Sequence, residues 1–220
     1  IIGDVMIISK YFLLFVFYSF LGWLMEVTQG YVRHKKFVNR GFLIGPYCPI
    51  YGYGTISMTL LLKGYANDPI VLFVMAIVIC SILEYTTSFV MEKLFKARWW
   101  DYSNRKFNIN GRICLETMIP FGILGCLMIY FVNPFMFAII DMIPSNLINI
   151  IAVILFIIYL VDNAVSITII SNLKDITLDV KGDSTEKVTK EVRKRVLAGQ
   201  QTLYKRIVKA FSSFKVVRKK

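Results

Sequence analysis

Long runs of apolar residues, separated by short polar stretches, make up most of the chain ahead of a basic tail. An α-helix needs about 20 such residues to cross the roughly 30 Å hydrocarbon layer of a bilayer. Five runs approach this length: Tyr11–Tyr31, Gly41–Leu62, Pro69–Met91, Ile113–Phe135 and Leu147–Ile170. The pattern therefore predicts an all-α fold, a polytopic membrane helix bundle with about five transmembrane helices.

The composition excludes an ordinary soluble domain. Hydrophobic residues make up 56% of the chain and charged residues 18%, whereas soluble domains contain about 45–50% and about 25%. The four cysteines lie in or beside the apolar runs without a CxxC pair, and there is one histidine. We therefore expect no metal site and no cofactor.

Basic residues predict the orientation of the bundle. The loop after the first run contains Arg33, Lys35, Lys36 and Arg40, and the loop after the third run is also basic, whereas Ala138–Asn146 has no Lys or Arg. From Lys174 onward the chain carries 14 Lys and Arg against 5 Asp and Glu. Since basic loops stay in the cytoplasm, we expect the N-terminus outside and the C-terminus inside.

The second run is the least regular of the five. Its stretch Gly41–Gly54 contains four glycines, two prolines and three tyrosines. Proline removes a backbone donor, so the carbonyl groups that lose a partner need another one. A broken helix that lines a cavity and a kinked helix whose glycines allow close packing both remain open.

Several acidic residues lie within or beside the apolar runs: Glu26, Glu84, Glu116 and Asp162. Glu84 lies about 10 Å from the cytoplasmic end of its predicted helix, too deep for a carboxylate to reach water easily. Arg40 and Arg112 are its candidate partners. Glu116 follows Arg112 by four residues, which predicts that both lie on one helix face. They can pair with each other, or each can reach across to another helix.

We therefore predict a polar binding pocket that faces the cytoplasm and is covered by two tryptophans. Its candidate residues are Glu26, Asn39, Arg40, Glu84, Trp99, Trp100, Asp101, Tyr102, Asn110, Arg112 and Glu116. None is expected to be catalytic. The alternative is a polar layer that only fixes the register of the helices.

The tail, residues 173–220, is predicted to be a cytoplasmic region distinct from the bundle at 1–172. Asp183 or Ser184 can cap a helix, and Val188, Val192 and Val196 begin an apolar stripe among basic residues. A basic amphipathic helix of this kind binds anionic lipid headgroups. Docking on a partner protein is an alternative, and too few aromatic residues interleave with the basic ones for nucleic-acid binding.

Four motifs resemble a family of small bacterial membrane proteins, the ABC transporter permeases of type IV, or CmpB-like proteins. They are Tyr18–Glu26 (YSFLGWLME), Phe37–Gly52 (FVNRGFLIGPYCPIYG), Trp99–Ser103 (WWDYS) and Phe107–Cys114 (FNINGRIC). The resemblance covers about residues 11–172. It implies a multi-pass protein of the bacterial inner membrane that acts as a permease subunit.

Three functions follow as hypotheses. A permease subunit would need a separate cytoplasmic ATPase, because the chain has no GxxxxGK[ST] loop, and five crossings suggest a homo- or hetero-oligomer. A membrane-embedded enzyme that acts on lipid headgroups at the inner leaflet is an alternative, although we expect no catalytic activity of the chain itself. A regulatory or scaffold protein that does not transport is the third.

Overall fold

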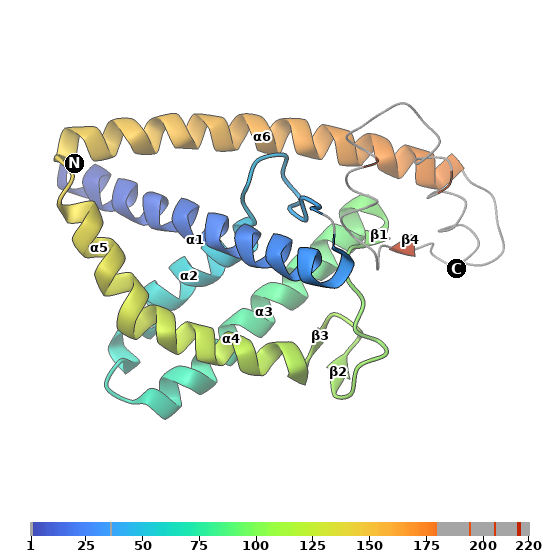
Figure 1. Ribbon diagram of the computed structural model, residues 1–220, viewed down its shortest axis with the longest axis horizontal. Coiled ribbons are helices and arrows are strands. Elements are labelled where there is room, and N and C mark those ends of the chain that lie inside the picture. The colour runs from blue at the N-terminus through green and yellow to red at the C-terminus, as the bar shows by residue number, and fades with distance from the viewer. Residues whose placement is uncertain (1, 36, 180–193, 195–204, 206–214, 217–220) are drawn as a thin grey trace. The chain divides into compact units, whose positions relative to one another are not determined.

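The computed structural model describes residues 2–35, 37–179, 194, 205 and 215–216, and helices dominate that part of the chain (Figure 1). The α-helices are α1 (Ile2–His34), α2 (Pro49–Leu62), α3 (Pro69–Phe95), α4 (Leu115–Leu127), α5 (Asn133–Asp141) and α6 (Ser145–Asp179). A 3-10 turn, η1 (Lys63–Tyr65), follows α2, and a π-helical turn, η2 (Met128–Val132), joins α4 to α5. The predicted all-helical membrane class is confirmed at this level.

Four helices of the described part are long and apolar enough to cross a membrane: Gly3–Val32, Pro69–Phe95, Leu115–Asp141 and Ser145–Ser171. In the apolar run Gly41–Leu62, where a broken and a kinked helix were both open, helix α2 begins only at Pro49 and has 14 residues. Proline has no N–H and suits the first turn of a helix. Pro49 therefore marks where helix becomes possible after the irregular residues 37–48.

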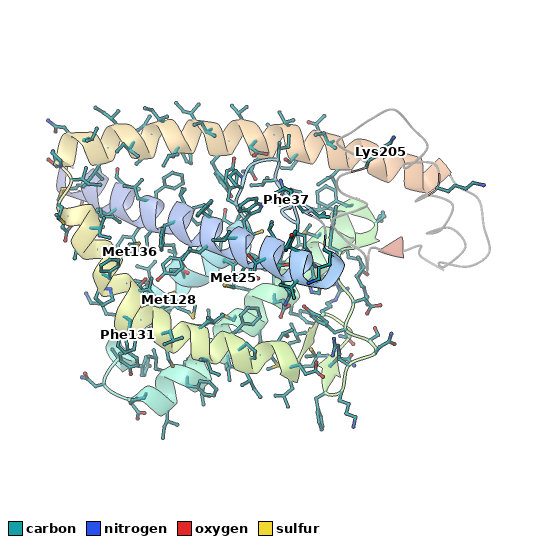
Figure 2. All side chains as sticks on the ribbon, viewed as in Figure 1. Met25, Phe37, Met128, Phe131, Met136 and Lys205 are labelled. Carbon is teal, nitrogen blue, oxygen red and sulfur yellow. The ribbon has the colours of Figure 1, made fainter. Side chains whose placement is uncertain are left out.

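Side chains on the long helices are largely exposed, as lipid-facing side chains would be. In the apolar 18-residue stretch that identifies α6 as able to cross a membrane, only 11% is buried within the chain. Large apolar side chains such as Phe131, 68% exposed, point away from the helices (Figure 2). A surface with so many exposed apolar side chains is unfavourable in water and favourable in the hydrocarbon of a bilayer.

The chain divides into two compact units, which we describe separately. The first unit contains Ile1–Gly22, Tyr47–Glu84 and Leu115–Val161. The second unit contains Trp23–Pro46, Tyr85–Cys114 and Asp162–Lys220. Helices α1, α3 and α6 each contribute their first part to the first unit and their last part to the second.

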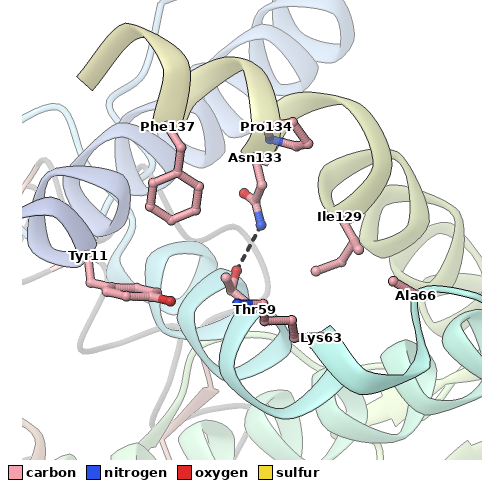
Figure 3. Close-up of a pocket in the computed structure, with 8 residues that line it drawn as sticks. All are labelled: Tyr11, Thr59, Lys63, Ala66, Ile129, Asn133, Pro134 and Phe137. Carbon is pink, nitrogen blue, oxygen red and sulfur yellow. Dashed lines mark hydrogen bonds between the residues drawn. The ribbon is translucent and has the colours of Figure 1, made fainter. Parts of the chain in front are cut away.

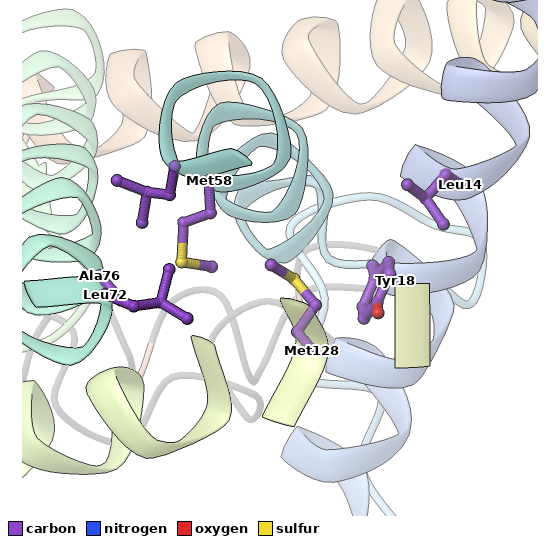
Figure 4. Close-up of a cluster of buried hydrophobic side chains, with 7 residues drawn as sticks. Leu14, Tyr18, Met58, Leu72, Ala76 and Met128 are labelled. Atoms are coloured by element: carbon purple, nitrogen blue, oxygen red, sulfur yellow. The ribbon is translucent and has the colours of Figure 1, made fainter. Parts of the chain in front are cut away.

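The core of the first unit joins α1, α2, α3 and η2 through buried side chains (Figure 4): Leu14, Tyr18, Met58, Leu62, Leu72, Ala76 and Met128. Small residues let these helices approach closely. A Cβ added at Gly125 would lie 2.7 Å from the Cβ of Ala76. Gly125 therefore has no room for a larger side chain without displacement of α3.

The π-helical turn interrupts the fourth membrane helix just before Pro134. The N–H of Asn133 bonds to the carbonyl of Met128, five residues back. Proline cannot donate to the carbonyl four residues before it and clashes with that group, and an inserted π-turn is a known way to accommodate such a break. The helix thus continues into α5 with a changed register.

Two short antiparallel pairs build the polar part of the second unit. Strand β2 (Asn108–Ile109) pairs with β3 (Ile113–Cys114), and β1 (Ala97–Arg98) pairs with β4 (Lys215–Val216). The predicted amphipathic helix from residue 183 onward lies outside the described residues. Since α6 extends to Asp179, the predicted boundary at residues 172 and 173 stays a prediction.

Candidate functional site

Glu92, near the end of α3, is the centre of an ion-pair network in the second unit. Its Oε2 accepts a hydrogen bond from Nε of Arg98 at 2.8 Å and lies 2.9 Å from Nη2 of Arg112. Nη1 of Arg98 also lies 3.8 Å from Oδ1 of Asp101. Charge-assisted contacts of this length are among the stronger polar interactions in proteins. The network joins α3 to the polar loop that follows it.

Arg112 is the most enclosed member of the network, with 6% of its surface exposed. Its Nη1 donates to Oγ of Ser88 at 3.0 Å, and its guanidinium carbon lies 5.7 Å and 5.5 Å from the ring centroids of Tyr85 and Phe89. A planar guanidinium suits this combination of ring faces and directed hydrogen bonds better than an ammonium does.

The expectation that Arg112 and Glu116 lie on one helix face is wrong. Helix α4 begins at Leu115, so Arg112 precedes it and lies between β2 and β3. A four-residue spacing brings side chains together only when both lie in the helix. The carboxylate that pairs with Arg112 is Glu92, which we did not include among the site residues, although it follows an apolar run and precedes a basic loop.

Three more predicted residues lie in the polar loop of the second unit. Nδ2 of Asn110 donates to the Tyr85 hydroxyl at 2.9 Å, and the N–H of Tyr102 donates to the carbonyl of Gly111 at 2.8 Å. Gly111 has φ +67°, and an added Cβ there would lie 2.6 Å from Oδ1 of Asp101. Glycine is thus required at this turn, because φ is positive and because Asp101 leaves no space for a Cβ.

The two tryptophans do not act as an equivalent pair. Trp99 is 2% exposed and packs against Phe42 and Phe95, with ring centroids 5.9 Å and 6.4 Å away. Nε1 of Trp100 donates to the main-chain carbonyl of Arg112 at 3.0 Å. Trp99 therefore belongs to an aromatic core, whereas Trp100 bonds to the backbone of the charged network.

Asn39 organises a second polar cluster around the irregular segment before α2. Its Oδ1 accepts from Nε1 of Trp23 at 2.7 Å and from the N–H of Gly41 at 3.0 Å, and its Nδ2 donates to the carbonyl of Ile44 at 2.9 Å. One amide side chain thus satisfies two backbone groups of a segment that has no helix to pair with, and the indole N–H of Trp23 as well.

Arg40 and Glu26 form an ion pair beside this segment, with 3.6 Å between Nε and Oε2. The Arg40 side chain passes over Gly30, where an added Cβ would lie 3.0 Å from Cδ. Arg40 is one of two candidate partners of Glu84, and that pairing stays a prediction. The ion pair with Glu26 joins residues near the adjacent ends of the first two predicted crossings.

Asp162 of α6 anchors the same irregular segment. Its Oδ1 accepts from the N–H of Ile44 at 2.9 Å and its Oδ2 from the N–H of Gly45 at 2.7 Å. Oγ of Ser166 donates to Oδ1 at 2.8 Å. The sequence marked Asp162 as an acid inside an apolar run, but we did not include it among the site residues.

Glu84 and Glu116 belong to the first unit, whereas the other nine predicted residues belong to the second. Glu84 is 7% exposed in α3, and Glu116 is an exposed residue in the first turn of α4. A carboxylate at that position interacts favourably with the helix dipole. The gathering of these two side chains with Arg112 stays a prediction.

Among the described residues of the second unit, the polar contacts given above fall into two clusters, one around Glu92 and one around Asn39 and Asp162. Each combines charges of both signs or pairs a charge with backbone N–H groups. Such clusters order loops and can present a defined polar surface. Their chemistry is that of binding and positioning.

The chain belongs to the family described as "Putative ABC-transporter type IV", whose model matches residues 13–167. The resemblance inferred from the four motifs is confirmed. The chain matched no curated protein and no solved structure. With its four apolar helices, the chain is a multi-pass membrane protein of an ABC-transporter type.

The substitution Glu92→Gln tests the ion-pair network. It removes the charge that faces Arg98 and Arg112, and loss of one partner from a buried ion pair costs about 3 kcal/mol. We expect a clear fall in the midpoint of thermal unfolding in detergent. The matched control is Asp141→Asn, because Asp141 pairs with Lys10 but is 56% exposed, and an exposed pair contributes at most about 1 kcal/mol. Equal shifts for both variants would contradict the network's role.

The substitution Asp162→Asn tests the anchor of the irregular segment. An amide has one acceptor oxygen, so one of the two N–H groups loses its partner. A hydrogen bond to a charged group contributes about 1.5–3 kcal/mol, so the amides of Ile44 and Gly45 should exchange about tenfold faster or more with deuterium. Ser166→Ala is the control, because it leaves both backbone contacts in place. Unchanged exchange in Asp162→Asn would rule out the anchor.

Proposed function

We propose that the protein is the membrane subunit of an ABC-type transporter that works with a separate cytoplasmic ATPase subunit. The family match over residues 13–167 carries this proposal. The sequence supports it as well, because no GxxxxGK[ST] loop for binding nucleotide occurs in the chain. The proposed location is the bacterial inner membrane, in a homo- or hetero-oligomer.

The proposal includes a fifth crossing formed by the segment around α2. The 14 residues of α2 span about 21 Å at 1.5 Å per residue, so the segment before them has to complete the crossing. Non-helical backbone is tolerated at membrane depth only where protein satisfies its polar groups. The contacts of Asn39 and Asp162 with residues 41–45 supply such partners.

This topology puts the N-terminus outside and the C-terminus inside. Reporter fusions after residues 36, 66, 104 and 143 should therefore read inside, outside, inside and outside. The physical reason is retention of the basic loops in the cytoplasm. A fusion after residue 66 that reads inside would exclude a crossing by α2 and contradict the arrangement of five.

The loop between α3 and α4 is the proposed contact surface for the ATPase. Phe107 is 79% exposed and Ile109 53% exposed, and the neighbouring Arg105 and Lys106 are exposed as well. Exposed apolar side chains rimmed by charges are typical of protein interfaces. The Glu92 network ties both ends of this loop to α3, through Arg98 and Arg112. A movement of the loop would therefore be transmitted to α3.

Co-purification from native membranes tests the ATPase proposal. We expect a nucleotide-binding subunit to be recovered with the wild-type chain and to be reduced several-fold by Phe107→Ser, because an exposed aromatic anchor is lost. The matched control is Met142→Ser, since Met142 is 84% exposed and lies between α5 and α6, on the proposed outer side. Recovery of no ATPase from wild-type membranes, together with no ATP-dependent flux after reconstitution with candidate ATPases, would overturn the proposal.

We further propose that the polar residues of the cytoplasmic side form the substrate path. The pocket predicted from the sequence also includes Glu84 and Glu116, which belong to the first unit. The basic tail, residues 173–220, would bind anionic lipid headgroups as a separate region. Its composition supports this, with 14 basic against 5 acidic residues from Lys174 onward.

A further inference from the structure

The first unit contains a cavity of about 270 Å³ between α1, α2, η1 and the turn around η2 (Figure 3). Its lining residues are Tyr11, Thr59, Lys63, Ala66, Ile129, Asn133, Pro134 and Phe137. None of them belongs to the cytoplasmic residues discussed above. The volume is near the lower end of small-molecule sites, which begin at about 300 Å³.

A buried chain of hydrogen bonds fixes the polar wall of this cavity. The Tyr18 hydroxyl donates to Oδ1 of Asn133 at 2.9 Å. Nδ2 of Asn133 donates to Oγ1 of Thr59 at 2.9 Å (Figure 3). Thr59 in turn donates to the carbonyl of Thr55 at 2.7 Å. Because Asn133 is 4% exposed and directly follows the π-turn, its amide is held in one orientation.

The free polar groups of the cavity are hydrogen-bond donors. In the described part of the chain, the Lys63 ammonium has no ion pair and the Tyr11 hydroxyl has no hydrogen bond. The amide of Asn133 has two N–H groups and uses one of them for Thr59. No acidic residue is among those that line the cavity. A ligand that offers acceptors and negative charge would complement this wall.

The remaining wall is apolar. Ile129, Pro134 and Phe137 line the cavity, and the rings of Tyr11 and Phe137 meet edge to face with centroids 5.7 Å apart. Ligand sites commonly combine such a wall with a few fixed polar groups. The ligand should therefore have an apolar body as well as an anionic end.

We propose that this cavity binds a small amphipathic anion, with its apolar body against Ile129, Pro134 and Phe137 and its anionic group beside Lys63. The anion has two chemical sources, a soluble carboxylate or an anionic lipid. The site is separate from the ATPase contact and goes beyond the proposed function. A negative result in the anion-binding experiments would therefore leave the ATPase proposal intact, and a negative co-purification result would leave the cavity proposal intact.

The test uses the full chain in nanodiscs of zwitterionic phosphatidylcholine, titrated with 3-phenylpropionate by equilibrium dialysis. Lys63→Met should weaken binding about tenfold or more, because a charge-assisted contact in a partly enclosed site is lost. Lys63→Arg should keep most of the affinity. Lys10→Met is the matched control, because Lys10 already pairs with Asp141. The neutral analogue 3-phenylpropanol should bind as weakly as the acid binds to Lys63→Met.

A second arm addresses the lipid source. Nanodiscs that contain phosphatidylglycerol are examined by native mass spectrometry for lipid retained by wild type, Lys63→Met and Lys10→Met. Retention that depends on Lys63 supports the proposal with lipid as the source, and Lys63-dependent binding of 3-phenylpropionate supports it with a soluble anion. Equal results for Lys63→Met and Lys10→Met in both arms, or no binding of either probe, would overturn it.

The substitution Ala66→Leu separates the cavity from surface charge. It places extra volume against the lining while leaving Lys63 in place. Loss of binding in this variant, with an unchanged thermal unfolding midpoint, is the expected result. Wild-type affinity in Ala66→Leu would show that the anion binds to Lys63 outside the cavity and would overturn the proposal.

Discussion

A polar group without a partner costs several kcal/mol in hydrocarbon, and this constraint explains the features that interrupt the helices. The carboxylate of Asp162 accepts from two consecutive backbone N–H groups. Asn133 links the side chains of Tyr18 and Thr59 beside the π-turn. Glu92 lies between two guanidinium groups. In each case one side chain of fixed geometry satisfies groups that regular helix cannot, and the chain can depart from a plain bundle there.

The same constraint separates the two units by chemistry. The first unit packs apolar side chains and close-set glycines around Met58 and Met128, with one hydrogen-bonded polar line through Asn133. The second unit contains the Glu92 network, the Arg40–Glu26 pair, the β2–β3 turn and the irregular segment before α2, whereas the exposed Lys10–Asp141 pair belongs to the first unit. In the proposed transporter, the second unit would contact the cytoplasmic partner. The first unit contains a largely apolar cavity with hydrogen-bond donors.

The residues of the predicted pocket are better described by what each one contacts than as one site. Trp99 packs in an aromatic core, Trp100 bonds to the backbone of Arg112, and Asn39 supports a loop. These are positioning contacts. They would give a binding surface its shape, and they explain why a polar-aromatic stretch persists between apolar segments.

Apolar runs and basic loops determined by themselves that the chain is helical and belongs in a membrane, and the motifs determined its family, because helix length and loop charge are local properties of sequence. The start of α2 at Pro49 was also readable from local rules, since proline suits a first turn. Tertiary structure alone decided that Arg112 pairs with Glu92 and that Asp162 caps residues 44 and 45. Several carboxylates lie at similar distances from Arg112 along the sequence. A hydrogen bond to a backbone N–H does not depend on the type of residue that supplies the N–H, so no sequence pattern predicts it. The cavity beside Asn133 depends in the same way on three helices and a shifted helical register.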